Sequence, residues 1–169
     1  PDQDLFDALK ENLSHHDSVL LVQAALTDRD GTISLKSGKN DGVSNSIFTG
    51  EMVSEASLST VESKAMNGFL ANIKERYQRI DVLKMDTEGA EWFLLDTPDS
   101  MLSDIGVIYM EFHSADFFPR LCNKLNETHV IHEAKIRFPH RGEVAWIRKD
   151  LLAAEQKNYE IRPAAENQG

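Results

Sequence analysis

Cysteine is almost absent from this chain, since Cys122 is the one cysteine among 169 residues. A single thiol excludes an intrachain disulfide framework and any zinc site built from several cysteines. Long apolar runs are also missing, and none approaches the roughly 20 residues that a membrane-spanning helix needs. Cys122 lies in a helical pattern of apolar and polar residues, so we expect it to have a packing role.

Basic residues are also fewer than acidic residues. The sequence has 18 Lys and Arg against 28 Asp and Glu, a formal net charge of -10 at pH 7. A nucleic-acid-binding surface needs a basic face, so this balance argues against a nucleic-acid partner. The length fits one domain over residues 1–149, followed by a charged tail over residues 150–169. The start of the chain carries no signal-peptide pattern, and we expect a cytoplasmic protein.

The stretch from Ile80 to Leu95 carries the densest chemical signal. It opens with an apolar run that predicts a strand buried on both faces. Asp86, Glu88 and Glu91 then follow within six positions around Gly89, where the chain is expected to turn into a helix. Ligands of open α/β sheets bind outside the carboxyl ends of the strands. Two interpretations stay open: a functional site, or a helix cap whose acids complement the positive end of the helix.

The rest of the chain alternates helical and strand patterns. We expect helices over residues 1–13, 61–77, 98–102 and 117–125, and strands over residues 19–26, 32–35, 105–112, 130–136 and 144–147. A polar stretch over residues 36–60 is either a substrate loop or lid, or a plain surface loop. This order predicts a mostly parallel sheet with right-handed crossovers and a terminal antiparallel pair.

A second group of polar residues ends the strand expected over residues 105–112. If this strand is parallel to the one before Asp86, Glu111 and His113 lie at the same edge of the sheet. The unperturbed pKa of histidine lies near neutrality, which makes His113 the best candidate for a general base. The alternative is a strand-end histidine bonded to backbone. Glu111 could likewise pair with Lys84 or with an arginine.

The run Ile-Asp-Val-Leu-Lys-Met-Asp-Thr-Glu-Gly-Ala-Glu at residues 80–91 resembles the signature of the FkbM-type methyltransferases. Weaker similarities at residues 1–13, 24–31, 108–113 and 143–147 extend the resemblance over most of residues 1–148. The resemblance implies a Rossmann-like class I methyltransferase fold, mostly parallel with a terminal antiparallel hairpin. It also implies S-adenosylmethionine as the cofactor and a hydroxyl group, typically on a sugar or polyketide, as the acceptor.

The resemblance further implies a set of site residues. The catalytic residues would be Asp86, Glu88 and His113, and the cofactor would contact Pro1, Gln23, Ala24, Ala25 and Asp86. The partner would be a small-molecule or glycan acceptor. The sequence assigns no defined set of metal ligands, although Asp86, Glu88 and Glu111 could hold a divalent cation or hydrogen-bond a polyol.

One family feature has no counterpart in this sequence. The family places the methionine end of the cofactor on a glycine-rich turn after the first strand, and the only early glycine here is Gly31. The acid that would hold the ribose hydroxyls at the end of the second strand is missing too. We therefore expect a domain without its N-terminal strands, with an exposed apolar edge and a tendency to self-associate. A non-catalytic methyltransferase-like binding module and a metal-dependent α/β hydrolase are the alternative functions.

Overall fold

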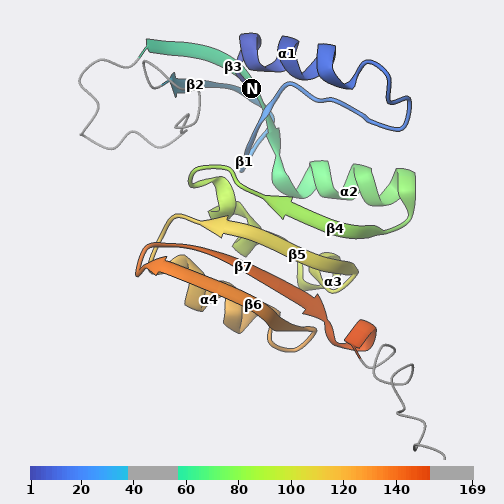
Figure 1. Ribbon diagram of the computed structural model, residues 1–169, viewed down its shortest axis with the longest axis vertical. Coiled ribbons are helices and arrows are strands. Elements are labelled where there is room, and N and C mark those ends of the chain that lie inside the picture. Colours follow the sequence, from blue (N-terminus) through green and yellow to red (C-terminus); the bar gives the residue numbers. More distant parts are fainter. Residues whose placement is uncertain (38–56, 153–169) are drawn as a thin grey trace, which may run out of the picture.

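The computed structural model describes residues 1–37 and 57–152, which form two β-sheets flanked by helices (Figure 1). The elements in chain order are α1 (Gln3–Leu13), β1 (Ala25–Thr27), β2 (Gly31–Ser37), β3 (Ser57–Ala65), α2 (Met66–Tyr77), β4 (Ile80–Met85), the 3-10 helix η1 (Ala90–Asp96), α3 (Asp99–Leu102), β5 (Ile105–Phe112), α4 (Phe117–Leu125), β6 (His129–Phe138) and β7 (Arg141–Arg148).

The smaller sheet has the strand order β1-β3-β2, with β1 parallel and β2 antiparallel to β3. The helix predicted near the N-terminus is present as α1, and the Asp2 carboxylate caps it by accepting a hydrogen bond from the Leu5 amide at 3.1 Å. The apolar face of α1 is not buried, and Leu5 and Leu9 are exposed. The smaller sheet therefore adds little to the core.

One prediction for this part of the chain is wrong and another is confirmed. The strand expected over residues 19–26 is reduced to β1, and Leu20 is 57% exposed. Apolar composition favours burial, but a strand also needs a pairing partner, and none of the described residues pairs with residues 19–24. The return strand expected over residues 32–35 is present within β2, where it pairs with β3.

The helix expected over residues 61–77 begins only at Met66, because β3 takes residues 57–65. Val61 and Ala65 are four positions apart, a spacing that puts two residues on one face of a helix and equally on one face of a strand. This segment is a strand because β3 pairs with β1 on one side and with β2 on the other. Most of the expected loop over residues 36–60 lies outside the described residues, as does the tail from residue 153.

The larger sheet has the strand order β4-β5-β7-β6. β4 and β5 are parallel, whereas β5 with β7 and β7 with β6 are antiparallel. The predicted strand over residues 105–112, the helix over residues 117–125 and the terminal hairpin are confirmed. The mostly parallel Rossmann-like sheet is not found, because the described residues form two mixed sheets with more antiparallel than parallel pairs.

The core lies between the larger sheet and the helices η1, α3 and α4, and Met66 and Leu70 of α2 belong to it as well. Every second residue of β5 faces it, so that Ile108, Met110 and Phe112 are fully buried. Cys122 packs against this core and burial raises the pKa of its thiol, in line with a packing role. The expectation that the strand at residues 80–85 is buried on both faces is wrong, because Val82 is 61% exposed.

Candidate functional site

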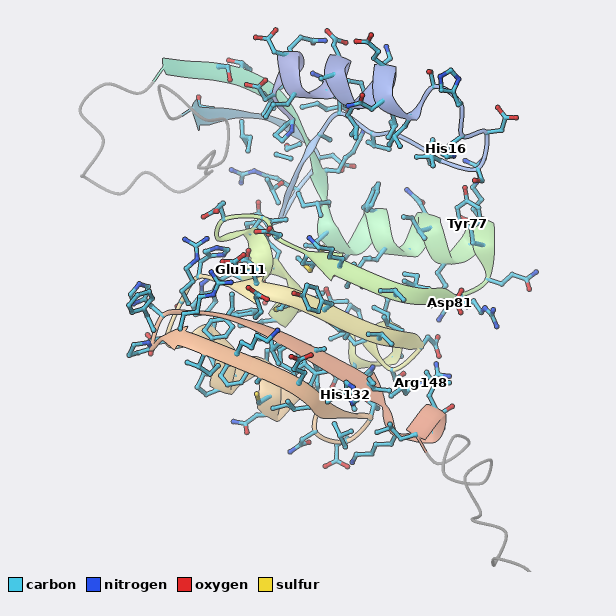
Figure 2. The ribbon with its side chains drawn as sticks, viewed as in Figure 1. His16, Tyr77, Asp81, Glu111, His132 and Arg148 are labelled. Atoms are coloured by element: carbon cyan, nitrogen blue, oxygen red, sulfur yellow. The ribbon has the colours of Figure 1, made fainter. Side chains whose placement is uncertain are left out.

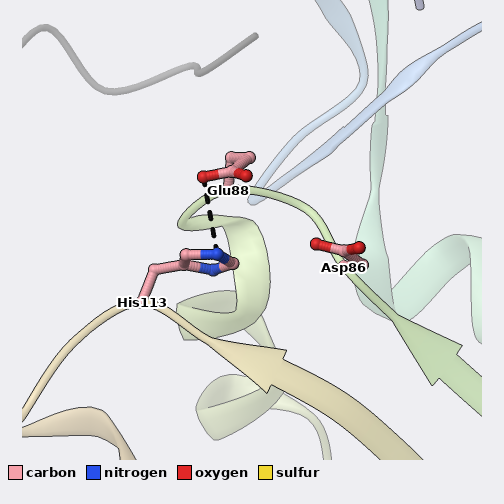
Figure 3. A group of neighbouring side chains, drawn as sticks. All are labelled: Asp86, Glu88 and His113. Atoms are coloured by element: carbon pink, nitrogen blue, oxygen red, sulfur yellow. Dashed lines mark ion pairs between the residues drawn. The ribbon is translucent and has the colours of Figure 1, made fainter. Parts of the chain in front are cut away.

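The site forms where the parallel strands β4 and β5 end side by side. Met85 is paired with Met110 at the last position of this ladder, so the residues that follow each strand emerge at the same edge. Asp86 follows β4, while Glu111 and His113 come from the end of β5 (Figures 2 and 3). The sequence-based expectation that these residues share one edge is confirmed.

Glu91 holds the turn that follows β4. Its carboxylate, 1% exposed, accepts hydrogen bonds from the Thr87 amide at 3.1 Å, the Thr87 hydroxyl at 3.0 Å and the Gly89 amide at 3.0 Å. Glu88 and Gly89 both have positive φ, 49° and 111°, a conformation that glycine adopts readily and glutamate rarely. The helix expected after Gly89 is the 3-10 helix η1.

His113 lies between two of these acids. Its Nδ1 is 3.2 Å from Glu91 Oε1, while its Nε2 is 3.4 Å from Glu88 Oε2 (Figure 3). A carboxylate accepts hydrogen bonds, so a neutral imidazole that donates to Glu91 carries its proton on Nδ1 and a lone pair on Nε2. His113 is thus bonded to a carboxylate rather than to backbone, the alternative that the sequence had left open.

The Nε2 atom of His113 is buried and forms no hydrogen bond within the described part of the chain. The whole side chain is 12% exposed, and the Glu111 carboxylate lies 3.8 Å from Nε2. Buried polar atoms without a partner are uncommon, and an ordered water, an ion or a catalytic role accounts for them.

Arg141 completes the group, and the sequence reasoning missed it. Its Nε donates to Glu111 Oε1 at 2.6 Å, and its guanidinium is 3.8 Å from Glu88. This hydrogen bond lowers the pKa of the Glu111 carboxyl and raises that of Arg141. Of the two partners foreseen for Glu111, the arginine is the one found. The register of β5 with β7 explains the position of Arg141. Phe112 is paired with Gly142, so the preceding residue, Arg141, lies at the end of β5.

The residues predicted to bind the cofactor lie in two places. Pro1 and Gln23 line a pocket of about 370 Å³ together with the start of α1 and part of β3. Gln23 donates hydrogen bonds to the Pro1 carbonyl at 3.4 Å and to Gln3 Oε1 at 3.1 Å. Ala25 is buried in β1. Asp86 lines a different pocket of about 150 Å³, with Lys84, Tyr109, Glu111 and Glu143.

Asp86, Glu88 and His113, the three residues predicted to be catalytic, are close together (Figure 3). Each offers one ligand atom, and the three atoms lie within 4.8 Å of one another. Carboxylates accept hydrogen bonds from hydroxyl groups, and a neutral imidazole accepts a proton. The group can therefore hold a polar ligand and deprotonate it.

The fold and the site together define an α/β domain with a titratable cluster at the carboxyl ends of two parallel strands, the position at which such sheets bind small molecules. The family model described as Methyltransferase FkbM domain matches residues 1–137. The chain belongs to the FkbM methyltransferase family, whose members generally use S-adenosylmethionine. No match was found among curated proteins or among solved structures.

Within residues 1–37 and 57–152, no helix is long and apolar enough to cross a membrane.

Proposed function

We propose that this protein transfers a methyl group from S-adenosylmethionine to a hydroxyl group of a sugar or other small metabolite. Membership of the FkbM family supports methyl transfer. The proposal of a hydroxyl acceptor rests on the His113 Nε2 lone pair, which faces Glu88 at the edge where the parallel strands end. A hydroxyl needs a base that removes its proton as the oxygen attacks, and a neutral imidazole has this capacity.

In this proposal His113 is the general base and Glu91 orients it. Glu91 fixes the tautomer through Nδ1 and, as a carboxylate, stabilises the imidazolium that forms when Nε2 takes up the proton. Glu91 is itself held by the amides of the turn after β4, so the imidazole starts from a fixed orientation.

Asp86 and Glu88 would position the acceptor. Two carboxylates beside a base suit a polyol, because neighbouring hydroxyls can donate to them while one hydroxyl faces His113. The same carboxylates repel an anionic acceptor, so we infer a neutral acceptor such as an uncharged sugar.

The cofactor would contact Pro1, Gln23, Ala24, Ala25 and Asp86. The pocket lined by Pro1 and Gln23, about 370 Å³, lies within the size range of small-molecule sites. Asp2 and Glu62 also line it, and their carboxylates suit ribose hydroxyls or an ammonium group. S-adenosylmethionine supplies an electrophilic methyl group when it is bound.

A non-catalytic binding module is the second candidate. It is favoured by one observation, that Asp86 and the pair Pro1 and Gln23 line separate pockets. The family match favours a methyltransferase over the metal-dependent hydrolase.

Transfer of an isotopically labelled methyl group from S-adenosylmethionine to a panel of sugars and polyols tests the proposal. We expect His113→Gln to lower turnover about 10²- to 10⁴-fold, the usual contribution of a general base. His132→Gln is the matched control, because His132 is an exposed histidine of β6 and we expect full activity from it (Figure 2). Equal activity of the two variants contradicts the base role, and failure of calorimetric titration to detect cofactor binding contradicts the methyltransferase proposal.

A further inference from the structure

We propose that Asp86, Glu88 and His113 form a binding site for one divalent transition-metal ion. Their three ligand atoms come from the ends of two different strands and converge within 4.8 Å of one another (Figure 3). In the tetrahedral arrangement that Zn²⁺ prefers, ligand atoms about 2.1 Å from the ion lie about 3.4 Å from one another. Closing the remaining gap takes a small movement of Asp86, whose side chain is exposed.

The buried, unbonded Nε2 of His113 is the independent observation behind this site. With its proton on Nδ1, the imidazole directs a lone pair toward Glu88 Oε2 at 3.4 Å. A lone pair facing a carboxylate is repulsive, and a cation between the two atoms turns the repulsion into two favourable contacts. The same three side chains thus form a poor hydrogen-bonding group and a suitable set of ligands.

Glu91 has the position of the outer partner that metal-binding histidines commonly have. Such histidines donate their second ring N–H to a carboxylate, which fixes the tautomer and makes the ligating nitrogen more basic. Here the Glu91 carboxylate is 3.2 Å from His113 Nδ1 and is almost completely buried. Because amides of the turn hold Glu91, this support exists before an ion binds.

The charge around the site also favours a cation. Asp86, Glu88, Glu91 and Glu111 lie around His113, and Arg141 pairs with two of them, Glu88 and Glu111. Counting Lys84, which lines the pocket with Asp86, these ionised groups still carry a formal charge of -2 when His113 is neutral. A divalent ion balances this charge.

The donor set selects the class of ion. Carboxylate oxygens alone suit Mg²⁺ and Ca²⁺, whereas an imidazole nitrogen suits Zn²⁺ and its neighbours in the first transition row. One imidazole and two carboxylates therefore favour Zn²⁺ or Co²⁺ over Mg²⁺. The set replaces the group of Asp86, Glu88 and Glu111 expected from sequence, because Glu111 is paired with Arg141.

This site does not depend on the proposed methyl transfer. The His113 Nε2 lone pair cannot hold an ion and accept a proton at once, so in the ion-bound form His113 is a ligand and not the base. A hydroxyl bound to the ion would then lose its proton more easily, because the ion lowers its pKa. The binding test below contains neither cofactor nor acceptor, so its failure would leave the methyltransferase proposal standing.

Calorimetric titration of the 169-residue chain with Zn²⁺ and Co²⁺ tests the site. We expect one ion per chain, no displacement by excess Mg²⁺, and loss of this binding in Asp86→Asn and in His113→Gln. Asp81→Asn is the matched control, because it removes the same charge at the opposite end of β4 (Figure 2), and it should bind like the unmodified chain. Glu91→Gln should weaken binding about 10- to 100-fold, the usual effect of losing an outer partner.

Paramagnetic Co²⁺ supplies a second measurement on the folded chain, since it should shift or broaden the imidazole NMR signals of His113 before those of His132. Three results would overturn the proposal. These are no saturable binding by the unmodified chain, equal weakening by Asp86→Asn and Asp81→Asn, and unchanged binding by a folded His113→Gln variant. If His113→Gln does not fold, the effect of Asp86→Asn on ion binding and the Co²⁺ effect on the His113 NMR signals test the proposal without it.

Discussion

At the scale of single residues, the site depends on one buried carboxylate. Glu91 accepts hydrogen bonds from the turn after β4 and from His113, and it thereby joins the ends of two strands into one rigid group. The sequence indicates acids at this position but not that Glu91 is buried while Asp86 is exposed. That division follows from the positive φ angles of Glu88 and Gly89, which turn the chain so that Glu91 folds back beneath it.

A second buried histidine, His129, predicts how stability depends on pH. It is 2% exposed, with Nε2 at 2.9 Å from the Ile105 carbonyl and Nδ1 at 2.8 Å from the Thr128 hydroxyl. Burial lowers its pKa below the ordinary 6.5, and the positive charge of Arg148 acts in the same direction, against the Ile105 hydrogen bond and the Asp150 charge. The native protein therefore favours neutral His129.

Well above pH 6.5, the ordinary pKa of histidine, His129 is neutral in both the folded and unfolded chains and contributes no pH dependence. As the pH falls below that value the unfolded chain takes up a proton that the native protein resists, so stability falls. We expect the melting temperature to decrease below about pH 6.5 less steeply in His129→Gln than in the unmodified chain. Thermal unfolding followed by circular dichroism from pH 8 to pH 5 measures this, and parallel curves would contradict it.

At the scale of elements, the sequence predicts the larger sheet better than the smaller one. The strand over residues 105–112, α4 and the terminal hairpin have clear apolar patterns, and each packs against the core. β3 is different, because its helical spacing at Val61 and Ala65 also fits a strand and the decision depends on pairing with distant strands. Local pattern suffices where an element packs on the core and fails where a long-range partner decides.

The hairpin of β6 and β7 contains a glycine that its packing requires. A Cβ at Gly142 would lie 2.7 Å from the Lys135 carbonyl oxygen and 2.9 Å from the Phe112 ring. We expect Gly142→Ala to destabilise the protein by about 1–3 kcal/mol, the usual cost of overpacking. Because Gly142 follows Arg141, the substitution should also disturb the ion pair with Glu111.

Gly68→Ala is the matched control for this prediction. Gly68 lies in α2, and an added Cβ there would meet only the Ala65 Cβ at 3.9 Å. Alanine in a helix is favoured over glycine by about 0.5–1 kcal/mol, so this variant should be slightly more stable. Urea unfolding distinguishes the two, and equal midpoints would contradict the packing argument.

At the scale of the whole molecule, apolar side chains remain exposed on the larger sheet and in the segment that precedes the smaller one. Val82 is exposed on β4, which is an edge strand of the larger sheet, and Val19, Leu20 and Val22 are exposed in the segment before β1. Edge strands with apolar side chains favour pairing with other chains. The self-association expected from sequence stays a prediction, and these residues are where we expect it to occur.

We expect Val82→Lys to reduce self-association, because a charge on an edge strand opposes pairing. Leu9→Lys on α1 adds the same charge at another exposed apolar residue and should have a smaller effect. Sedimentation velocity at several protein concentrations measures both. A monodisperse unmodified chain, or equal effects of the two substitutions, would count against an association through β4.

We infer that His113 carries its proton on Nδ1, held by Glu91, and directs the Nε2 lone pair at the acids of the site. Both the base proposed for methyl transfer and the ligand proposed for a metal ion require this tautomer. Nitrogen-15 NMR of the imidazole at neutral pH tests the claim directly, with His113→Gln to assign the signals. We expect a protonated Nδ1 and an unprotonated Nε2, and a proton found on Nε2 would contradict this tautomer.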